Sequence, residues 1–320
     1  MARHLEKLRT KETTCNFFPI DPIEAGDEGK DTLALALVCR NAAAYIDEWL
    51  SFHELAGVRH FYVYDNRSDD GTAAAALRRR AGGTCVSVHP WIIRPAAEGS
   101  WHQRKFHVST QELAYCHAVL NYGPLHRWMA FIDIDEFLVP MKHLTLPEAL
   151  AQLPASNISL PWFNFGHCGH ETMPDAPVVH SYRRRHQLAA DERVHVKCVM
   201  RTDRIATVGL HLFETTDMGE ATVNDRGKRI SRGGELSGED VTNELIQLNH
   251  YRTKSIAEHR VSKSYYMHGH DARERKQVLA GEIDRLAQNT CEDGAALDFL
   301  SRHGISSAEQ FQRHIDGGSK

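Results

Sequence analysis

The chain has no excess of positive charge and no framework of paired cysteines, and each absence excludes a class of protein. Its 320 residues include 38 Lys and Arg against 42 Asp and Glu, a formal net charge of −4. No global basic field is therefore present to attract nucleic acid, and any phosphate binding must be local. The seven cysteines are dispersed without a CxxC pair, so we expect small buried side chains instead of disulfides.

Long apolar runs are also lacking. No stretch approaches the roughly 18 consecutive apolar residues that cross a bilayer. Residues 1–7 are too polar to open a secretory signal. With 42% apolar and 25% charged residues, the composition is that of a soluble globular protein. We therefore expect a cytoplasmic protein that has no transmembrane segment, and peripheral contact with a membrane stays open.

Apolar runs that alternate with helical patterns dominate the first half of the chain. We expect strands at 32–39, 60–65 and 85–89, a further apolar strand that begins at 128 and ends at an acidic turn at 133–136, and helices that begin near 46, 72 and 109. The apolar positions in the first of these helices recur at helical spacing, and Gly57 is placed to end it. Strands that are apolar throughout predict an α/β fold, a mostly parallel sheet with helices on both faces. Ligands of such sheets bind at the carboxyl ends of the strands.

The pattern becomes mixed beyond Pro140, which predicts a smaller antiparallel portion in the second half. Strands are expected near 157–161, 178–183, 195–200, 207–213 and 246–251, a long mobile loop at 214–243, and helices at 255–267 and near the C-terminus. The predicted organisation is a flexible N-terminal arm (1–30), a main domain (31–267) and a C-terminal helical extension (268–320).

The strongest chemical signal is an acidic triplet at the end of an apolar strand. Asp133, Asp135 and Glu136 follow 128–132 directly. Three carboxylates so close together repel one another unless a cation compensates. Mg²⁺ or Mn²⁺ prefers oxygen ligands and commonly takes one or two carboxylates together with substrate phosphate oxygens. The alternative interpretation is a solvated acidic turn.

A second polar turn, 65–71, also follows a strand. Asp65 is placed to bind a base or ribose, and Ser68 with the amides at the start of the next helix would complete a polar pocket. Ordinary turn chemistry is the alternative, with Asp70 or Thr72 capping the following helix.

A third group surrounds His250. A neutral imidazole is a good metal ligand, and nearby Lys254, Arg260 and Lys263 supply positive charge for a diphosphate leaving group. A histidine at a strand end can equally be structural.

These motifs, in this order and spacing, resemble GT-A glycosyltransferases of the family 2 and family 92 type. The resemblance covers about 32–265 and rests on several segments. They are Arg40-Asn41, Tyr45, Glu48-Trp49, His53, Gly57, 60–70, Trp128, 131–137, Trp162, Phe165-Gly166, Lys197 and 249–255. One departure is the absence of an acidic residue directly after Asn41, where three alanines follow.

The resemblance implies one Rossmann-like nucleotide-sugar transferase domain with Asp133 and Asp135 as a DxD metal motif. Asp65 then resembles the nucleoside-binding acid, and His250 the C-terminal histidine that reaches the metal or diphosphate. Expected metal ligands are Asp133, Asp135 and His250, with Mn²⁺ or Mg²⁺ as cofactor. The expected nucleotide-sugar-binding residues are Arg40, Asn41, Asp65, Ser68, Asp70, Gln111, Asp133, Lys254 and Lys263.

The implied reaction transfers a sugar from a nucleotide sugar, expected to carry UDP, to an acceptor hydroxyl with inversion. The acceptor is a glycan, a lipid-linked molecule or a small molecule. The metal and Asp135 act on the diphosphate, and a carboxylate such as Glu171 or Asp175 is the candidate general base. Trp162 and Phe165 either stack against the acceptor sugar or belong to the core.

Two other functions fit parts of the pattern. A haloacid-dehalogenase-type phosphohydrolase also places Asp-x-Asp after an apolar strand, although there the motif follows the first strand of the catalytic domain. A catalytically silent module that binds a nucleotide or sugar would keep the fold without the reaction.

Overall fold

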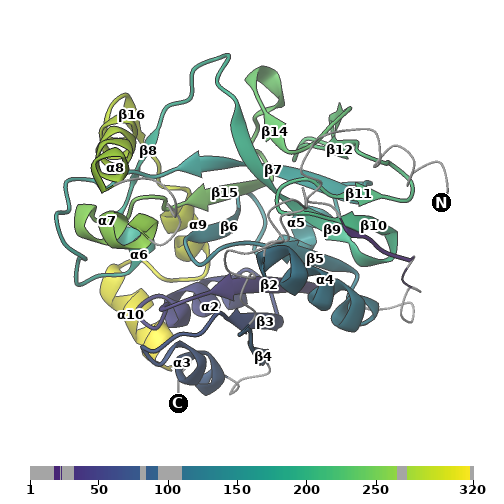
Figure 1. The fold of residues 1–320 in the computed structure, drawn as a ribbon, viewed down its shortest axis with the longest axis horizontal. Coiled ribbons are helices and arrows are strands. Elements are labelled where there is room, and N and C mark those ends of the chain that lie inside the picture. The colour runs from purple at the N-terminus through teal and green to yellow at the C-terminus, as the bar shows by residue number, and fades with distance from the viewer. Residues whose placement is uncertain are drawn as a thin grey trace, which may run out of the picture.

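A large twisted sheet runs through the computed structural model, which describes residues 18–21, 23, 32–79, 84–92, 110–264 and 272–317 (Figure 1). Its first half is parallel and is built from β2 (Leu33–Cys39), β3 (His60–Asp65), β4 (Cys85–Pro90) and β5 (Trp128–Phe131), in the order β4-β3-β2-β5. Residues 33–37 of β2 are buried on both faces, which is why this strand is apolar throughout.

Helices cover both faces of this parallel half. Leu33, Leu35 and Leu37 point into one core together with α2 (Ile46–Leu55), whereas Ala34 and Ala36 point into a second core with α4 (Thr110–Tyr122). The two-residue period of the strand separates the two cores. The third helix, α3 (Thr72–Arg78), packs against α2 and β4. The predicted α/β fold with helices on both faces is confirmed.

The second half of the sheet mixes directions. The strands β7 (Asn157–Asn164) and β9 (Val194–Arg201) are antiparallel to each other, and β9 lies antiparallel beside β5. After β5, the chain turns at 132–135 into β6 (Glu136–Pro140), which pairs antiparallel with β15 (Ile246–His250); β15 also runs parallel to β7. The acidic turn therefore lies beside the carboxyl end of β15.

Shorter elements complete the second half. They are α5 (Leu146–Leu150), α6 (Val178–Ser181), β8 (Arg184–His186), β10 (Ile205–Val208), β11 (Glu214–Thr215), β12 (Thr222–Val223), β13 (Arg229–Ile230), β14 (Glu235–Leu236) and three 3₁₀ turns, Gly123–Leu125, Thr202–Arg204 and Gly238–Asp240. The strand β1 (Phe18–Pro19) pairs with β10. In Figure 1, β10, β11 and β12 lie at the right of the molecule.

Two predicted elements are of the wrong type, and the strand expected at 207–213 is β10, which ends at Val208. The segment 214–243 is folded into short strands, because β12 pairs with β7 and the fully buried Asp225 carboxylate accepts backbone hydrogen bonds from Leu245 and Ile246 at 2.7 and 3.3 Å. The strand expected at 178–183 begins instead with the helix α6, whose first amides donate to the buried Glu48 carboxylate. In both cases the deciding partner is distant in the sequence.

The C-terminal elements are α7 (Ile256–Ser264), α8 (Ala272–Ala287), β16 (Thr290–Glu292), α9 (Ala295–Arg302) and α10 (Ala308–Gly317). They pack against the main sheet body: β16 pairs with β8, and Phe311 of α10 lies 6.5 Å from the ring of Phe52 on α2. In Figure 1, α7, α8 and α10 lie along the left of the molecule. The three-part division at residues 30 and 267 stays a prediction. Among the described helices, none combines the length and hydropathy of a membrane span.

Candidate functional site

The turn between β5 and β6 places its three carboxylates in different environments. Asp133 is partly exposed, and its carboxylate receives hydrogen bonds from Lys197 Nζ at 3.0 Å and from Gln111 Nε2 at 2.8 Å. Its backbone amide donates to Glu136 Oε2 at 2.8 Å, which holds the turn closed. Asp133 is thus bound by side chains of α4 and β9.

Glu136 and Lys197 form a buried ion pair under this turn. The Glu136 side chain is 0% exposed and lies 3.8 Å from Lys197 Nζ, and the Lys197 side chain is 3% exposed. Burial raises the pKa of Glu136 well above its usual range, while Lys197 counteracts part of that rise. Burial alone would lower the pKa of Lys197, but Asp133 and Glu136 outweigh it and raise that pKa, so the ammonium stays charged.

Asp135 faces His250 at the edge of the sheet where β5 and β15 end, which we call the rim. Asp135 Oδ2 lies 3.7 Å from His250 Nε2, and the Asp135 carbonyl accepts a hydrogen bond from Tyr251 N at 2.8 Å. Burial lowers the pKa of His250, with Asp135 opposing, so the imidazole stays neutral near pH 7 and keeps a lone pair for a ligand. Its Nδ1 is buried without a hydrogen-bond partner.

These two side chains fit a divalent metal, whereas the predicted three-residue ligand set is not assembled. No group of three or more His, Cys, Asp or Glu within the described ranges is arranged to hold a metal ion. Asp133 is drawn toward Lys197 and Gln111 instead of toward Asp135 and His250. A carboxylate oxygen and an imidazole nitrogen at 3.7 Å remain, and Mg²⁺ or Mn²⁺ commonly adds phosphate oxygens to so small a protein set.

A partly buried cation lies near this pair. Lys254 has a left-handed backbone (φ +48°), and its Nζ lies 3.8 Å from the centroid of the Tyr45 ring. Burial lowers the pKa of Lys254, and the charges of Asp135 and Glu48 oppose this shift. A lysine held here in an unfavourable backbone conformation is typical of a functional position.

Glu48 closes the same region from α2. Its two carboxylate oxygens accept hydrogen bonds from Val178 N at 2.7 Å and Val179 N at 3.1 Å. Burial raises the pKa of Glu48 to about 7, while the two amides and Lys254 oppose the rise. Glu48 therefore positions α6, and its charge acts on Lys254.

The turn at 65–71 leads from β3 into α3 and is hydrogen-bonded to the residues that follow β2. Ser68 Oγ accepts from Asn41 N at 2.9 Å, and Asp70 accepts from Ala43 N at 2.9 Å and Thr72 N at 3.0 Å. Ordinary turn chemistry therefore accounts for these side chains. Asp65 accepts from Ser68 N through Oδ1 only, and within the described part of the chain its Oδ2 takes no hydrogen bond.

The other predicted nucleotide-sugar contacts differ in where the structure places them. Arg40 is exposed directly after β2, and Gln111 reaches the site through Asp133. Lys263 lies in α7, but its side chain is outside the described residues.

Aromatic and imidazole rings form a wall beside the site, which we call the ring wall: Trp162, His195, His211 and His250. The Trp162 ring centroid lies 4.3 Å from that of His250, 5.3 Å from His195 and 5.2 Å from His211. Sequence reasoning missed His195 and His211. The signal for His195 was its position two residues before Lys197, which puts both on one face of a strand.

Of the two predicted acceptor-stacking residues, Phe165 belongs to the core. It is 1% exposed and packs 4.8 Å from the Tyr251 ring, so no sugar reaches its face. Trp162 is 8% exposed, with an indole N–H that has no hydrogen-bond partner, and Arg252 lies over its ring at 5.7 Å. Trp162 is therefore a largely covered member of the ring wall.

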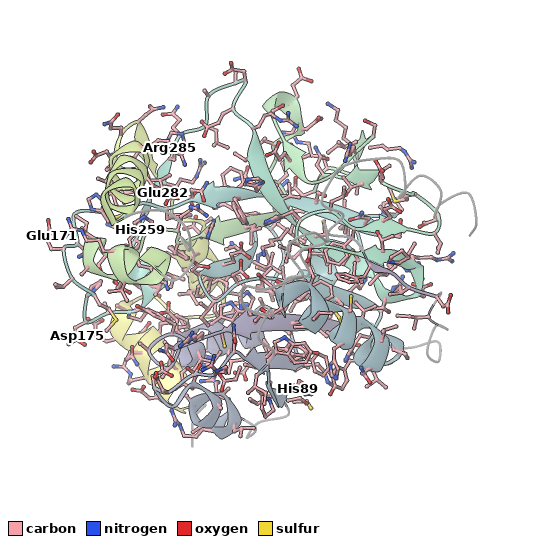
Figure 2. The ribbon with its side chains drawn as sticks, viewed as in Figure 1. His89, Glu171, Asp175, His259, Glu282 and Arg285 are labelled. Atoms are coloured by element: carbon pink, nitrogen blue, oxygen red, sulfur yellow. The ribbon has the colours of Figure 1, made fainter. Side chains whose placement is uncertain are left out.

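The two carboxylates predicted as general bases lie elsewhere. Figure 2 shows Glu171 and Asp175 at the outer left edge of the molecule, and both are exposed. The Glu171 carbonyl accepts a hydrogen bond from Ala257 N at 3.0 Å, which ties its loop to α7. The structure does not bring Glu171 together with the aspartates of the rim.

The helix α8 is tied to the rim through a small charged cluster. Glu282 forms an ion pair with Arg252 and lies 3.2 Å from His259 Nε2. Figure 2 shows His259 and Glu282 on the adjoining helices α7 and α8. Because Arg252 also covers Trp162, the C-terminal elements help to fix the ring wall.

Two solved structures are similar to this chain at a coarse level. Glucosyl-3-phosphoglycerate synthase from Mycobacterium tuberculosis, in complex with Mn²⁺, UDP and glucosyl-3-phosphoglycerate, is 19% identical, with 42% of this chain and 44% of that chain covered and a TM-score of 0.26. TarS 1–349 of S. aureus, in complex with UDP-GlcNAc, is 11% identical over 79% and 72% of the two chains, with a TM-score of 0.35. Likeness at these scores transfers no ligand and no residue role.

Sequence relatives and a family model agree with each other. Proteins named as glycosyltransferase family 92 proteins match from Oryza sativa subsp. japonica (28% identical over 178 residues), Ricinus communis (24% over 200) and Arabidopsis thaliana (29% over 108). These segments cover 54%, 61% and 34% of this chain but only 27%, 34% and 16% of the relatives. The model of glycosyltransferase family 92 matches residues 38–287. Because that match spans well over half of its length, this chain belongs to glycosyltransferase family 92.

Proposed function

We propose that this chain is a metal-dependent glycosyltransferase that moves a sugar from a nucleotide sugar, with UDP as the nucleotide, to an acceptor hydroxyl with inversion. One observation carries the proposal: Asp135 and His250, which are far apart in the sequence, face each other at 3.7 Å near the partly buried cation of Lys254. Family membership supports the same reaction class.

The chemistry requires positive charge where the sugar–phosphate bond breaks. Negative charge develops on the departing diphosphate, and fixed cations in a partly buried site stabilise it strongly. Asp135 and His250 would hold Mn²⁺ or Mg²⁺, which supplies Lewis acidity when bound. Lys254 adds a positive charge on the side of Tyr45 and Glu48.

The remaining residues orient the donor. Asp65, with a carboxylate oxygen to spare at the end of β3, is the candidate contact for the nucleoside. Asp133 is held by Lys197 and Gln111, so it fixes the position of the turn and places a negative charge beside Asp135. The nature of the acceptor and the cytoplasmic location stay predictions.

Isothermal titration of UDP with and without Mn²⁺ tests the metal pair. We expect UDP binding that depends on Mn²⁺ in the wild type and at least about 10-fold weaker Mn²⁺-dependent binding in Asp135→Asn, since outer partners of metal sites alone cost 10–100-fold. Asp191→Asn, at an exposed surface position, is the control and should bind as the wild type does. Equal UDP binding with and without Mn²⁺, or no binding, would contradict the proposal.

A second assay separates transfer from the alternatives. Wild-type protein is incubated with UDP-glucose, UDP-galactose and UDP-N-acetylglucosamine in Mn²⁺, and slow release of UDP from one donor identifies the sugar. A silent binding module would bind Mn²⁺–UDP and release nothing. Hydrolysis of a phosphomonoester without turnover of any donor would instead indicate a phosphohydrolase.

A further inference from the structure

We propose that His195, oriented by Glu235, accepts the proton of the attacking hydroxyl in this site. The inference rests on the proposed function, because a proton acceptor is needed only if a hydroxyl attacks the donor sugar. It assigns to an imidazole of β9 the role that the sequence suggested for Glu171.

The β-sheet places His195 at the rim. Ala130 of β5 pairs with Val199 of β9, so the residues of β9 that precede 199 extend past the end of β5 and along the acidic turn. Lys197 reaches Asp133 at 3.0 Å from there. His195 lies on the same face of β9 as Lys197, about 6.6 Å further along the strand. Its side chain is 53% exposed.

A carboxylate orients the imidazole. Glu235 lies directly opposite His195 in the antiparallel pairing of β14 with β9, and its Oε1 is 3.5 Å from His195 Nδ1. The other oxygen, Oε2, is held by Arg193 at 3.0 Å, so the carboxylate is anchored in place. Nε2 is then directed away from Glu235 and takes no hydrogen bond within the described residues. An acid that orients a base in this way is the usual arrangement for an imidazole that moves protons.

The neighbouring rings suit a positive charge on His195. The His211 ring stacks on it at 5.3 Å with an angle of 25°, and His211 Nδ1 is hydrogen-bonded to the Val196 carbonyl at 2.9 Å. Burial and the charge of Lys197 lower the pKa of His211 to about 4, so His211 stays neutral and does not repel an imidazolium beside it. The charged groups around His195 are thus Glu235, Arg193 and the more distant Lys197, which is itself paired.

The ring wall connects His195 to the proposed metal pair. Trp162 contacts His195 on one side and His250 on another, and His250 faces Asp135. His250 of the proposed metal pair and the proposed proton acceptor His195 therefore lie against the same Trp162 ring. Glu171, by contrast, is exposed at the outer edge of the molecule (Figure 2).

The acceptor oxygen forms a bond to the anomeric carbon while its proton passes to His195 Nε2. The bond from the anomeric carbon to the diphosphate oxygen breaks, and its electron pair leaves with the diphosphate. Glu235 stabilises the imidazolium until the proton passes to water.

The test uses water and azide as acceptors, so no acceptor needs to be known. With the UDP-sugar that releases UDP in Mn²⁺, His195→Ala should lose about 10²- to 10⁴-fold in kcat for UDP release, the usual share of a general base. Its dissociation constant for Mn²⁺–UDP should match the wild type. Glu235→Gln should show a smaller loss of kcat.

Azide rescue distinguishes proton transfer from a structural role. Azide carries no proton to remove, so adding sodium azide to His195→Ala should restore UDP release and yield a glycosyl azide, detected by mass spectrometry. His143→Ala is the matched control: His143 follows β6 at the end of that strand away from the rim, and its variant should behave as the wild type does, with no azide effect.

Several results would overturn the inference. They are an unchanged kcat in His195→Ala, a raised KM at constant kcat, lost Mn²⁺–UDP binding, or no glycosyl azide. Loss of turnover in Glu171→Gln but not in His195→Ala would return the role to the loop carboxylate. Wild-type protein that binds no Mn²⁺–UDP would overturn the proposed function itself, and this inference with it.

Discussion

Replacement of Lys197 by methionine tests the buried charges under the acidic turn. Within the described residues, the substitution removes the one cation that pairs with Glu136, which is 0% exposed, while Asp133 is 32% exposed and keeps the hydrogen bond from Gln111. Nearly all the cost therefore falls on Glu136. Removing one partner of a buried ion pair costs about 3–5 kcal/mol, a large share of the roughly 5–15 kcal/mol of a whole domain.

The pH dependence of this cost has a definite sign. Lys197 lowers the pKa of Glu136 in the wild type, so Lys197→Met raises that pKa further above its usual range. The folded variant then binds the Glu136 proton more tightly than the unfolded chain does. Its stability decreases as the pH rises from the usual carboxyl range through the raised pKa. Lys197→Met should therefore differ least from the wild type near pH 5 and most near pH 8.

Urea unfolding followed by circular dichroism measures the effect at both pH values. The double variant Lys197→Met/Glu136→Gln should recover much of the stability, because no buried charge remains. Arg226→Met is the control, since Arg226 and Glu244 form an exposed pair at 2.8 Å that is worth at most about 1 kcal/mol. A cost for Lys197→Met below about 1 kcal/mol at pH 7, or one equal at pH 5 and pH 8, would refute the reasoning.

Three further substitutions test residues that stabilise the fold around the site. The raised pKa of Glu48, about 7, makes the folded wild type bind this proton more tightly than the unfolded chain does, so the thermal midpoint should decrease between pH 4.5 and 7. Glu48→Gln should remove this decrease, and identical pH curves for the two proteins would contradict the prediction. Gly57→Ala should destabilise the protein by more than about 1 kcal/mol, since φ is +91° and an added Cβ would lie 2.8 Å from the Thr145 Cβ; an unchanged urea midpoint would oppose it. Phe311→Ala, at a 0% exposed position in α10, should cost about 3–5 kcal/mol in the single global transition, whereas a separate early transition would mean that the C-terminal extension unfolds alone.

The architecture of the first half was predictable because its signals are local. The apolar run at 33–39, the helical spacing from Ile46 and the placement of Asp133 after a strand all depend on neighbouring residues. The segment 214–243 and the helix α6 were not predictable in this way. Each is fixed by a distant partner, since β12 pairs with β7 and Glu48 binds the first amides of α6.

The sequence by itself determined which groups have the right chemistry: a carboxylate pair at a strand end, a histidine near the end of the domain and a nearby lysine. Only the tertiary structure decided their partners. Pairing of β6 with β15 brings His250 to Asp135, and pairing of β5 with β9 brings Lys197 to Asp133 and His195 to the rim. Such contacts depend on strand order and register across many intervening residues, and no local pattern of residue types encodes them.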